Sequence, residues 1–326
     1  MNTSPGQMRA ARLVEPRRIE IVDAPVPDPN EGEVRVKVEG CGVCASNIPP
    51  YEGREDFRYP MTPGELGHEA WGTVDAVGRG VTGFQPGDRV GMLSHRAFAD
   101  YDTAEARHVV KLPKMLGDRP FPGEPLAAAI NIFRRSGVHR DATVAVVGIG
   151  FLGALLCRLA IDAGARVVAM TRRPSALRFA SAVGATTEVM DDQWRIVEAC
   201  KREGGHLGPG GADVVIECVG RQWPLDVASE LVREHGRLVI AGFHQDGART
   251  VNMRQWNLKG LDVINAHEHR PETCVNGMRS AVEMVADGRL AVEPLLTHAF
   301  TLDRLAEALE LSIERPEGFL KAWIRM

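Results

Sequence analysis

The sequence lacks the features of a membrane or secreted protein. No apolar run approaches the length that spans a bilayer, and the first ten residues, MNTSPGQMRA, have no apolar core of a signal peptide. The 6 cysteines are scattered through apolar segments and do not have the spacing of a disulfide framework. These absences predict a protein of the reducing cytoplasm that does not enter a membrane.

The sequence also lacks a long basic run, an internal repeat and a low-complexity segment. Its formal net charge of −4 argues against a nucleic-acid partner. With 326 residues, 44% of them hydrophobic and 25% charged, the chain is long enough for two globular domains, each with its own core.

The clearest motif lies in residues 142–173, ATVAVVGIGFLGALLCRLAIDAGARVVAMTRR. An apolar strand is followed by a GxGxxG turn, a helix and a second apolar strand, the context in which this spacing indicates a dinucleotide site. The first glycine allows a tight turn, the second lets a pyrophosphate approach the backbone, and the third lets helix and strand pack closely. The residues predicted to hold the phosphates over the helix N-terminus are Gly148, Gly150, Phe151, Leu152 and Gly153.

The end of the second strand favours NADP over NAD. An enzyme that selects NAD places an acidic residue there to bind the ribose 2′-hydroxyl. In this chain the position holds Thr171, and Arg172 and Arg173 follow it. Two guanidinium groups would bind a 2′-phosphate through charge-assisted hydrogen bonds.

The remaining pattern predicts an α/β protein with a doubly wound parallel sheet of the Rossmann type and a second, mostly β domain. Short alternating segments fill residues 8–112, a connecting helix is expected over 124–138, and strands alternate with helices over 143–265. The expected domains are 1–124 with 268–326 for the mostly β part, and 125–267 for the dinucleotide-binding part.

Five motifs in order resemble those of the zinc-dependent, medium-chain alcohol and polyol dehydrogenases. They are GCGVCASN (40–47), GELGHEAWG (64–72), GDRV (87–90), GEPLAAA (123–129) and GIGFLG (148–153). The resemblance extends from about Met8 to the C-terminus and implies that the mostly β domain is catalytic.

The resemblance implies one catalytic zinc held by Cys44, His68 and Glu124, with Glu69 as an alternative or exchanging ligand. Thiolate, imidazole and carboxylate with one open position is also a chemically reasonable catalytic set. Taken singly, each residue has an ordinary explanation, such as a packed cysteine or an acidic residue in the first turn of a helix. A structural zinc is not expected, because 91–112 lacks the four closely spaced cysteines that many relatives carry.

Two positions depart from the family pattern. Asn47 stands where an aspartate usually does, and we expect it to orient the zinc-binding histidine without supplying charge, so that Asn47→Asp should tighten zinc. Pro49 replaces a histidine that passes the proton outward in many members. Tyr51 and His95 are possible pocket residues, and His267 and His269 are interpreted as a solvated or interface loop.

The implied activity is hydride transfer between NADP and a secondary alcohol or polyol, with zinc on the substrate oxygen and Ser46 accepting the proton. Cys44, His68 and Ser46 are therefore the expected catalytic residues. A zinc-free reductase of an activated double bond and a non-catalytic dinucleotide-binding protein remain alternatives. The apolar segment 261–266 is expected to pair two copies, giving a homodimer or homotetramer.

Overall fold

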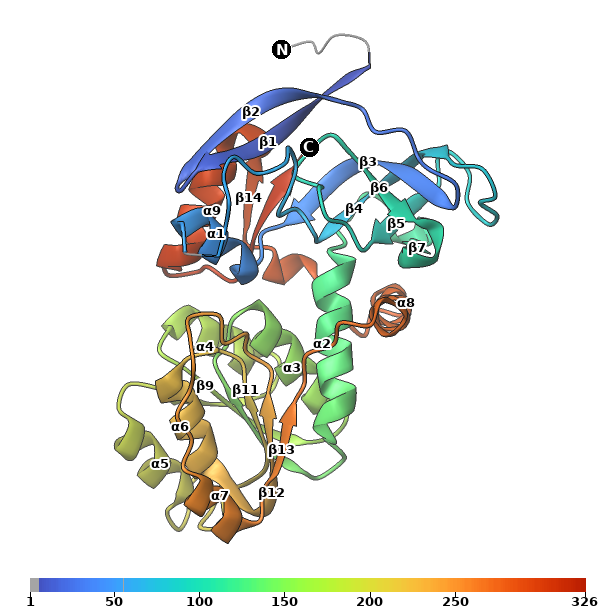
Figure 1. Ribbon diagram of the computed structural model, residues 1–326. Coiled ribbons are helices and arrows are strands. Elements are labelled where there is room, and N and C mark those ends of the chain that lie inside the picture. The colour runs from blue at the N-terminus through green and yellow to red at the C-terminus, as the bar shows by residue number, and fades with distance from the viewer. Residues whose placement is uncertain (1–5, 55) are drawn as a thin grey trace. The chain divides into compact units, whose positions relative to one another are not determined.

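The computed structural model describes residues 6–54 and 56–326, which form two compact units (Figure 1). The first unit runs to Ala127 and resumes at His269, and the second comprises Ala128–Glu268. Helix α2 (Gly123–Ser136) passes from the first unit into the second. The chain therefore leaves the first unit once and returns to complete it.

The first unit is built mainly of strands. A seven-stranded sheet has the order β14-β15-β3-β4-β5-β7, with β6 paired to β3, and β1 and β2 form a separate antiparallel pair. The strands are β1 (Gln7–Glu15), β2 (Arg18–Pro25), β3 (Glu33–Gly42), β4 (Ala70–Val77), β5 (Arg89–Met92), β6 (Tyr101–Glu105), β7 (Val109–Lys111), β14 (His298–Thr301) and β15 (Ala322–Arg325). The helices are α1 (Ile48–Glu52), α8 (Pro271–Ala286) and α9 (Leu305–Glu314), with short 3₁₀ turns η1 (Ala45–Asn47), η2 (Ala106–His108), η3 (Lys114–Leu116), η4 (Glu293–Leu295) and η5 (Leu302–Arg304).

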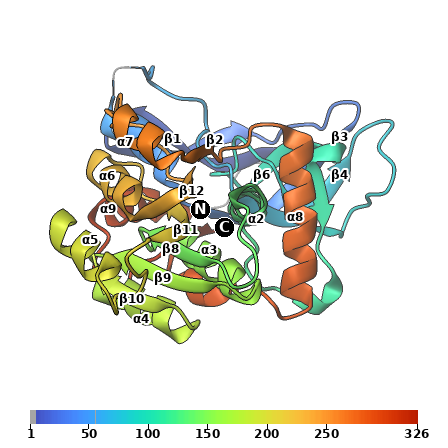
Figure 2. The same cartoon turned by 90° about the horizontal axis from the view of Figure 1, so that it is seen from below.

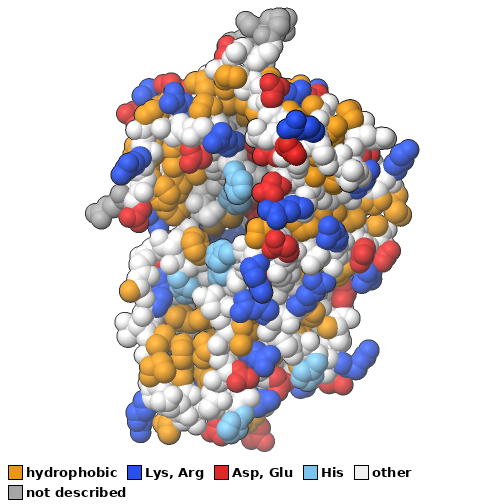
Figure 3. Space-filling view, turned by 45° about the vertical axis from the view of Figure 1, so that its right-hand side comes forward, with side chains coloured by type: hydrophobic (Ala, Val, Ile, Leu, Met, Phe, Trp, Pro, Cys, Tyr) orange, Lys and Arg blue, Asp and Glu red, His pale blue; other side chains and the backbone are white. Residues whose placement is uncertain are grey.

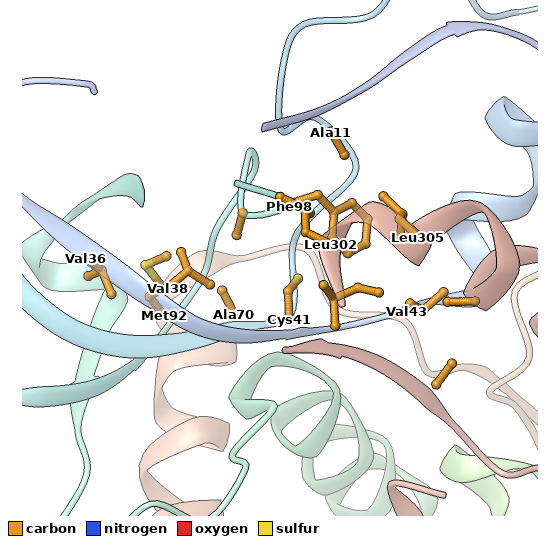
Figure 4. Close-up of a cluster of buried hydrophobic side chains, with 14 of the residues drawn as sticks. Ala11, Val36, Val38, Cys41, Val43, Ala70, Met92, Phe98, Leu302 and Leu305 are labelled. Atoms are coloured by element: carbon orange, nitrogen blue, oxygen red, sulfur yellow. The ribbon is translucent and has the colours of Figure 1, made fainter. Parts of the chain in front are cut away.

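Strand β3 shows why this region forms a sheet with one buried face. Val34, Val36 and Val38 are at most 3% exposed, whereas the intervening Arg35 and Lys37 face outward, the period-two pattern of a strand. The three valines belong to one buried cluster, and Figure 4 shows Val36 and Val38 in it with residues of the C-terminal segment, Leu302 and Leu305. The last part of the chain thus completes the core that the first part begins.

The second unit is a parallel six-stranded sheet with the order β10-β9-β8-β11-β12-β13, which Figure 2 shows for β10 to β12. Its elements are β8 (Thr143–Val147), α3 (Phe151–Asp162), β9 (Arg166–Thr171), α4 (Pro174–Ala182), β10 (Thr186–Val189), α5 (Gln193–Lys201), β11 (Ala212–Glu217), α6 (Gln222–Leu231), β12 (Val232–Ile240), α7 (Met253–Lys259) and β13 (Asp262–Asn265). All five residues of β8 are buried, as expected of a central parallel strand. Because the strand order reverses between β8 and β11, the carboxyl ends of these strands mark the crevice where such sheets bind ligands.

The structure confirms the predicted fold class, a doubly wound parallel sheet beside a mostly β part. On the face shown in Figure 3, acidic and basic side chains are interspersed. Within the described residues, no helix combines the length and the apolar character that crossing a bilayer requires.

Candidate metal and nucleotide sites

Three metal-binding side chains meet in the first unit. Cys44 follows β3 in the turn that leads into η1, and His68 and Glu69 directly precede β4. One donor atom from each of these residues lies within 4.8 Å of the other two. Antiparallel pairing of β3 with β4, down to Cys41 opposite Ala70, brings the two segments together.

The orientation of His68 leaves one ring nitrogen available to a metal. Its Nδ1 lies 2.9 Å from the Leu66 carbonyl oxygen, so Nδ1–H donates to that oxygen and Nε2 is the nitrogen left for a metal. Ser46 Oγ lies 3.5 Å from that Nε2. The predicted proton acceptor therefore stands beside the ring atom that would bind zinc.

Asn47 does not accept a hydrogen bond from His68, contrary to the expected contact. Its Oδ1 accepts a hydrogen bond from the Cys44 backbone N–H at 2.9 Å, and its Nδ2 donates to the Leu66 carbonyl at 2.9 Å. Asn47 thus reaches His68 only through Leu66, and it does so as a donor. Asn47→Asp would lose that donation and set a carboxylate against a carbonyl, so the expected tightening of zinc no longer has a structural basis.

Glu69 is held in a buried ion pair with Lys321. The Lys321 Nζ lies 2.7 Å from Oε2 and 2.9 Å from Oε1 of Glu69, and also donates to the Val43 carbonyl at 3.2 Å. Burial alone would lower the pKa of Lys321, but the charge of Glu69 raises it above its ordinary value. A Cβ at Gly42 would lie 1.8 Å from Glu69 Oε2, so the absence of a side chain at this position makes room for the pair.

Glu124 is the second carboxylate, in the first turn of α2. Among the described residues it makes no hydrogen bond or ion pair, which distinguishes it from Glu69. Burial raises the pKa of Glu124 to about 7, against the opposing effect of His68, and the charge of Glu69 adds to the rise. Glu124 therefore has no hydrogen-bonded or ion-paired partner among the described residues, and His68 and Lys321 favour its charged form only through longer-range attraction.

The donor set fits a divalent cation. Burial by itself would lower the pKa of His68, but the neighbouring Cys44, Glu69 and Glu124 raise it to about 10. The metal-free cluster thus attracts a positive charge. A cysteine sulfur, an imidazole nitrogen and carboxylate oxygens are also the ligand types that Zn²⁺ prefers.

In the second unit, the glycine-rich turn has the geometry that the motif requires. Gly148 adopts a positive φ of 97°, and a Cβ at Gly153 would lie 2.0 Å from the Gly148 carbonyl oxygen. At Gly150 a Cβ would meet nothing within 4 Å, so the backbone there is open to a ligand. Phe151 and Leu152 begin α3, whose N-terminus favours a phosphate.

The three residues at the end of β9 differ in their burial and contacts. Thr171 is buried at 7% exposure, and Arg173 donates to the Ile149 carbonyl of the glycine-rich turn at 2.8 Å. Arg172 is exposed, and its Cζ lies 4.6 Å from the centroid of the Trp223 ring. The chain thus carries two cations and no acidic residue at this point.

The other candidate residues from the sequence lie in positions that do not indicate a functional role. Tyr51 is 1% exposed and its hydroxyl donates to Glu310 at 2.9 Å; burial and this hydrogen bond raise the pKa of the phenol. His95 is exposed, and its backbone N–H donates to Asp102. The His267 ring makes a tilted contact with the Phe243 ring, 5.5 Å between centroids, and His269 is exposed.

The sequence reasoning missed Lys321, although a signal was present. A single charged residue interrupts the apolar segment FLKAWI (319–324), where a lysine is expected only if it is paired. Its partner, Glu69, lies 252 residues earlier, so no local pattern identified it.

Known families match both parts of the chain. The alcohol dehydrogenase GroES-like domain matches residues 30–117, and the zinc-binding dehydrogenase family matches 152–284. Human sorbitol dehydrogenase is 28% identical over 328 residues, covering 90% of this chain and 90% of its own length.

Solved structures agree with these matches. A candidate zinc-binding dehydrogenase from Sinorhizobium meliloti 1021, bound to NADP, has a TM-score of 0.86 and 27% identity over 98% of this chain and 99% of its own. An Escherichia coli CFT073 alcohol dehydrogenase in complex with NADH has a TM-score of 0.84, with 22% identity, 98% of this chain and 100% of its own.

The fold and the donor set define a metal-dependent oxidoreductase. The chain belongs to the zinc-dependent, medium-chain alcohol and polyol dehydrogenase family, as its motifs suggested. It is therefore an enzyme that uses zinc and a nicotinamide cofactor on small-molecule substrates.

The buried ion pair generates a stability prediction. Lys321→Ala should lower the free energy of unfolding by about 3–5 kcal/mol, because it leaves the Glu69 carboxylate buried without a partner. Glu69→Gln/Lys321→Met, which removes both charges, should be clearly more stable than Lys321→Ala. Urea denaturation measures both variants, with the exposed Lys114→Ala as a control. Equal stability of Lys321→Ala and the control would contradict the assignment.

Proposed function

We propose that the protein transfers a hydride between NADP and a secondary alcohol or polyol, forming the corresponding ketone. The observation that carries this proposal is the cluster of Cys44, His68 and Glu69, together with Glu124, a carboxylate outside that group of three whose pKa responds to the charges of His68 and Glu69. The sorbitol dehydrogenases among the relatives support a polyol, and the glutamate in GEPLA is similar to that branch.

The division between the two carboxylates supports Glu124 as the third zinc ligand. Glu69 is neutralised by Lys321, whereas Glu124 has no partner of its own among the described residues. A buried carboxylate without compensation is costly unless a cation binds it. In this proposal Cys44, His68 and Glu124 bind the metal, and Glu69 contributes to the electrostatic potential around it.

When bound, zinc polarises the substrate oxygen and the nicotinamide accepts the hydride. The chain's own residues position these groups and move the proton. Ser46 Oγ, 3.5 Å from His68 Nε2, would accept the proton of the substrate hydroxyl and release its own hydroxyl proton to solvent as the carbon loses its hydride and becomes a ketone. Asn47 and Leu66 fix Cys44 and His68 during this step.

The preference for NADP follows from Arg172 and Arg173. Both follow the strand whose end lies near the adenosine ribose, and the sequence has no acidic residue at this point. A 2′-phosphate would accept charge-assisted hydrogen bonds from them, each about 1.5–3 kcal/mol.

A substrate panel tests the function and the cofactor together. Polyols and secondary alcohols should reduce NADP with a higher kcat/KM than primary alcohols, and NAD should be used less well. Arg172→Ala/Arg173→Ala should raise KM for NADP at least about tenfold and change that for NAD little. Arg178→Ala, on α4, is the matched control. Higher efficiency with NAD in the unaltered enzyme, or turnover only on activated double bonds, would refute the proposal.

Zinc analysis tests the ligand set. The purified protein should hold about one zinc per chain, and Cys44→Ala or His68→Ala should lose both zinc and turnover. Glu124→Gln should weaken zinc more than about 100-fold, beyond the 10–100-fold typical of residues that only orient ligands. Glu69→Gln/Lys321→Met, which keeps the buried charge balanced, should fall within that lower range. If Glu69→Gln/Lys321→Met weakened zinc binding more than Glu124→Gln did, the third zinc ligand would be Glu69.

We also propose a dimer built on β13. This strand ends the sheet and pairs only with β12 in the described chain, so its outer edge can pair with a second copy. Light scattering should show at least a dimer at micromolar concentration. Ile264→Lys on β13 should favour the monomer, whereas Val189→Lys on β10, at the opposite edge of the same sheet, should not. A monomeric unaltered protein would contradict the proposal.

A further inference from the structure

The contact between Arg172 and Trp223 joins two parts of the nucleotide crevice. Arg172 follows β9, and Trp223 is the second residue of α6, which follows β11. Strand β8 lies between β9 and β11 in the sheet. The stacked pair, with 4.6 Å from Cζ to the ring centroid, therefore links the carboxyl ends of two strands on either side of the glycine-rich turn that follows β8.

Trp223 is a fixed platform. Its ring is half-buried and packs against the apolar cluster that includes Leu225 and Ile196. The ring thus has the core behind it and the Arg172 guanidinium over it. An exposed arginine has considerable rotamer freedom, and a flat aromatic surface reduces it.

The neighbouring cations already have partners. Arg221 and Arg249 both pair with Asp246, and Arg249 also donates to the Gly220 carbonyl at 2.8 Å. Arg173 donates to the Ile149 carbonyl. Arg172, by contrast, makes no hydrogen bond or ion pair among the residues described, so its N–H groups remain available to a ligand.

We infer that Trp223 is a specificity-determining positioning residue, which holds Arg172 so that its guanidinium edge can bind the adenosine 2′-phosphate. The ring lies against one side of the guanidinium, 4.6 Å from Cζ to its centroid, and the five N–H donors of the fork include others that can bind a phosphate at the same time. This inference rests on the proposed use of NADP and extends it to a residue that contacts the arginine and lies on a different helix.

Calorimetry with adenosine 2′,5′-bisphosphate and 5′-AMP isolates the 2′-phosphate. The measured quantity is the ratio of the two dissociation constants, since damage to the pocket in general weakens both ligands alike. Trp223→Ala should reduce the preference for the bisphosphate about two- to fivefold, as expected for loss of an exposed cation–π contact. Trp223→Phe, which keeps an aromatic face, should change it less than about twofold. Arg172→Ala should reduce it at least about tenfold.

A double mutant separates positioning from other effects. In the Arg172→Ala background, Trp223→Ala should no longer alter the ratio, because the residue that Trp223 positions is absent. Arg172→Lys leaves Trp223 and α6 intact and keeps the charge but not the planar fork, so it should also reduce the ratio.

The outcomes distinguish the two proposals. If the unaltered protein does not prefer the bisphosphate over AMP, both the use of NADP and the role of Trp223 are wrong. If it does prefer the bisphosphate but Trp223→Ala leaves the ratio unchanged, or lowers it equally without Arg172, only the role of Trp223 is overturned.

Discussion

The ion pair between Glu69 and Lys321 links the metal site to the closure of the first unit. Lys321 directly precedes β15, and β15 pairs with the end of β3, where Trp323 lies opposite Gly42. The same Gly42 leaves the space that the Glu69 carboxylate occupies. The pairing of the C-terminal strand with β3 therefore also supplies the cation that neutralises Glu69. Because a buried charge without its partner is strongly destabilising, the carboxylate beside Cys44 and His68 depends on this pairing.

This constraint explains how two neighbouring carboxylates differ in chemistry. Lys321 carries a positive charge in direct contact with Glu69, so that carboxylate is stable without a metal. Glu124 has no such partner in the contacts described, and its pKa of about 7 reflects a site that resists a further negative charge. A metal that binds Glu124 relieves this cost, whereas binding Glu69 would compete with an existing ion pair. The difference arises from surroundings, not from residue type.

Much of the fold and of the candidate site could be predicted because the signals are local. The glycine spacing and the buried strand before it lie within about ten residues of each other, and Cys44 and His68 stand in short motifs. Long-range pairings could not be read in this way. Lys321 reaches Glu69 across 252 residues, and the sequence does not show that Asn47 bonds to Leu66 rather than to His68. Spacing predicts which residues meet in one element, but the partner of a polar atom depends on how separate elements pack.

The nucleotide site of the second unit also depends on a contact between separate elements that the sequence motifs do not predict. The two arginines after β9 indicate a phosphate site from sequence alone, but they make different contacts in the structure. Arg173 is tied to the backbone of the glycine-rich turn, and Arg172 rests on Trp223, a residue of another helix. A guanidinium that is already held in place loses less conformational entropy when it binds a phosphate. The entropy cost of ordering it therefore does not reduce the affinity for the phosphate. The contribution of Arg172 to selectivity therefore depends on an aromatic ring that no motif places near it.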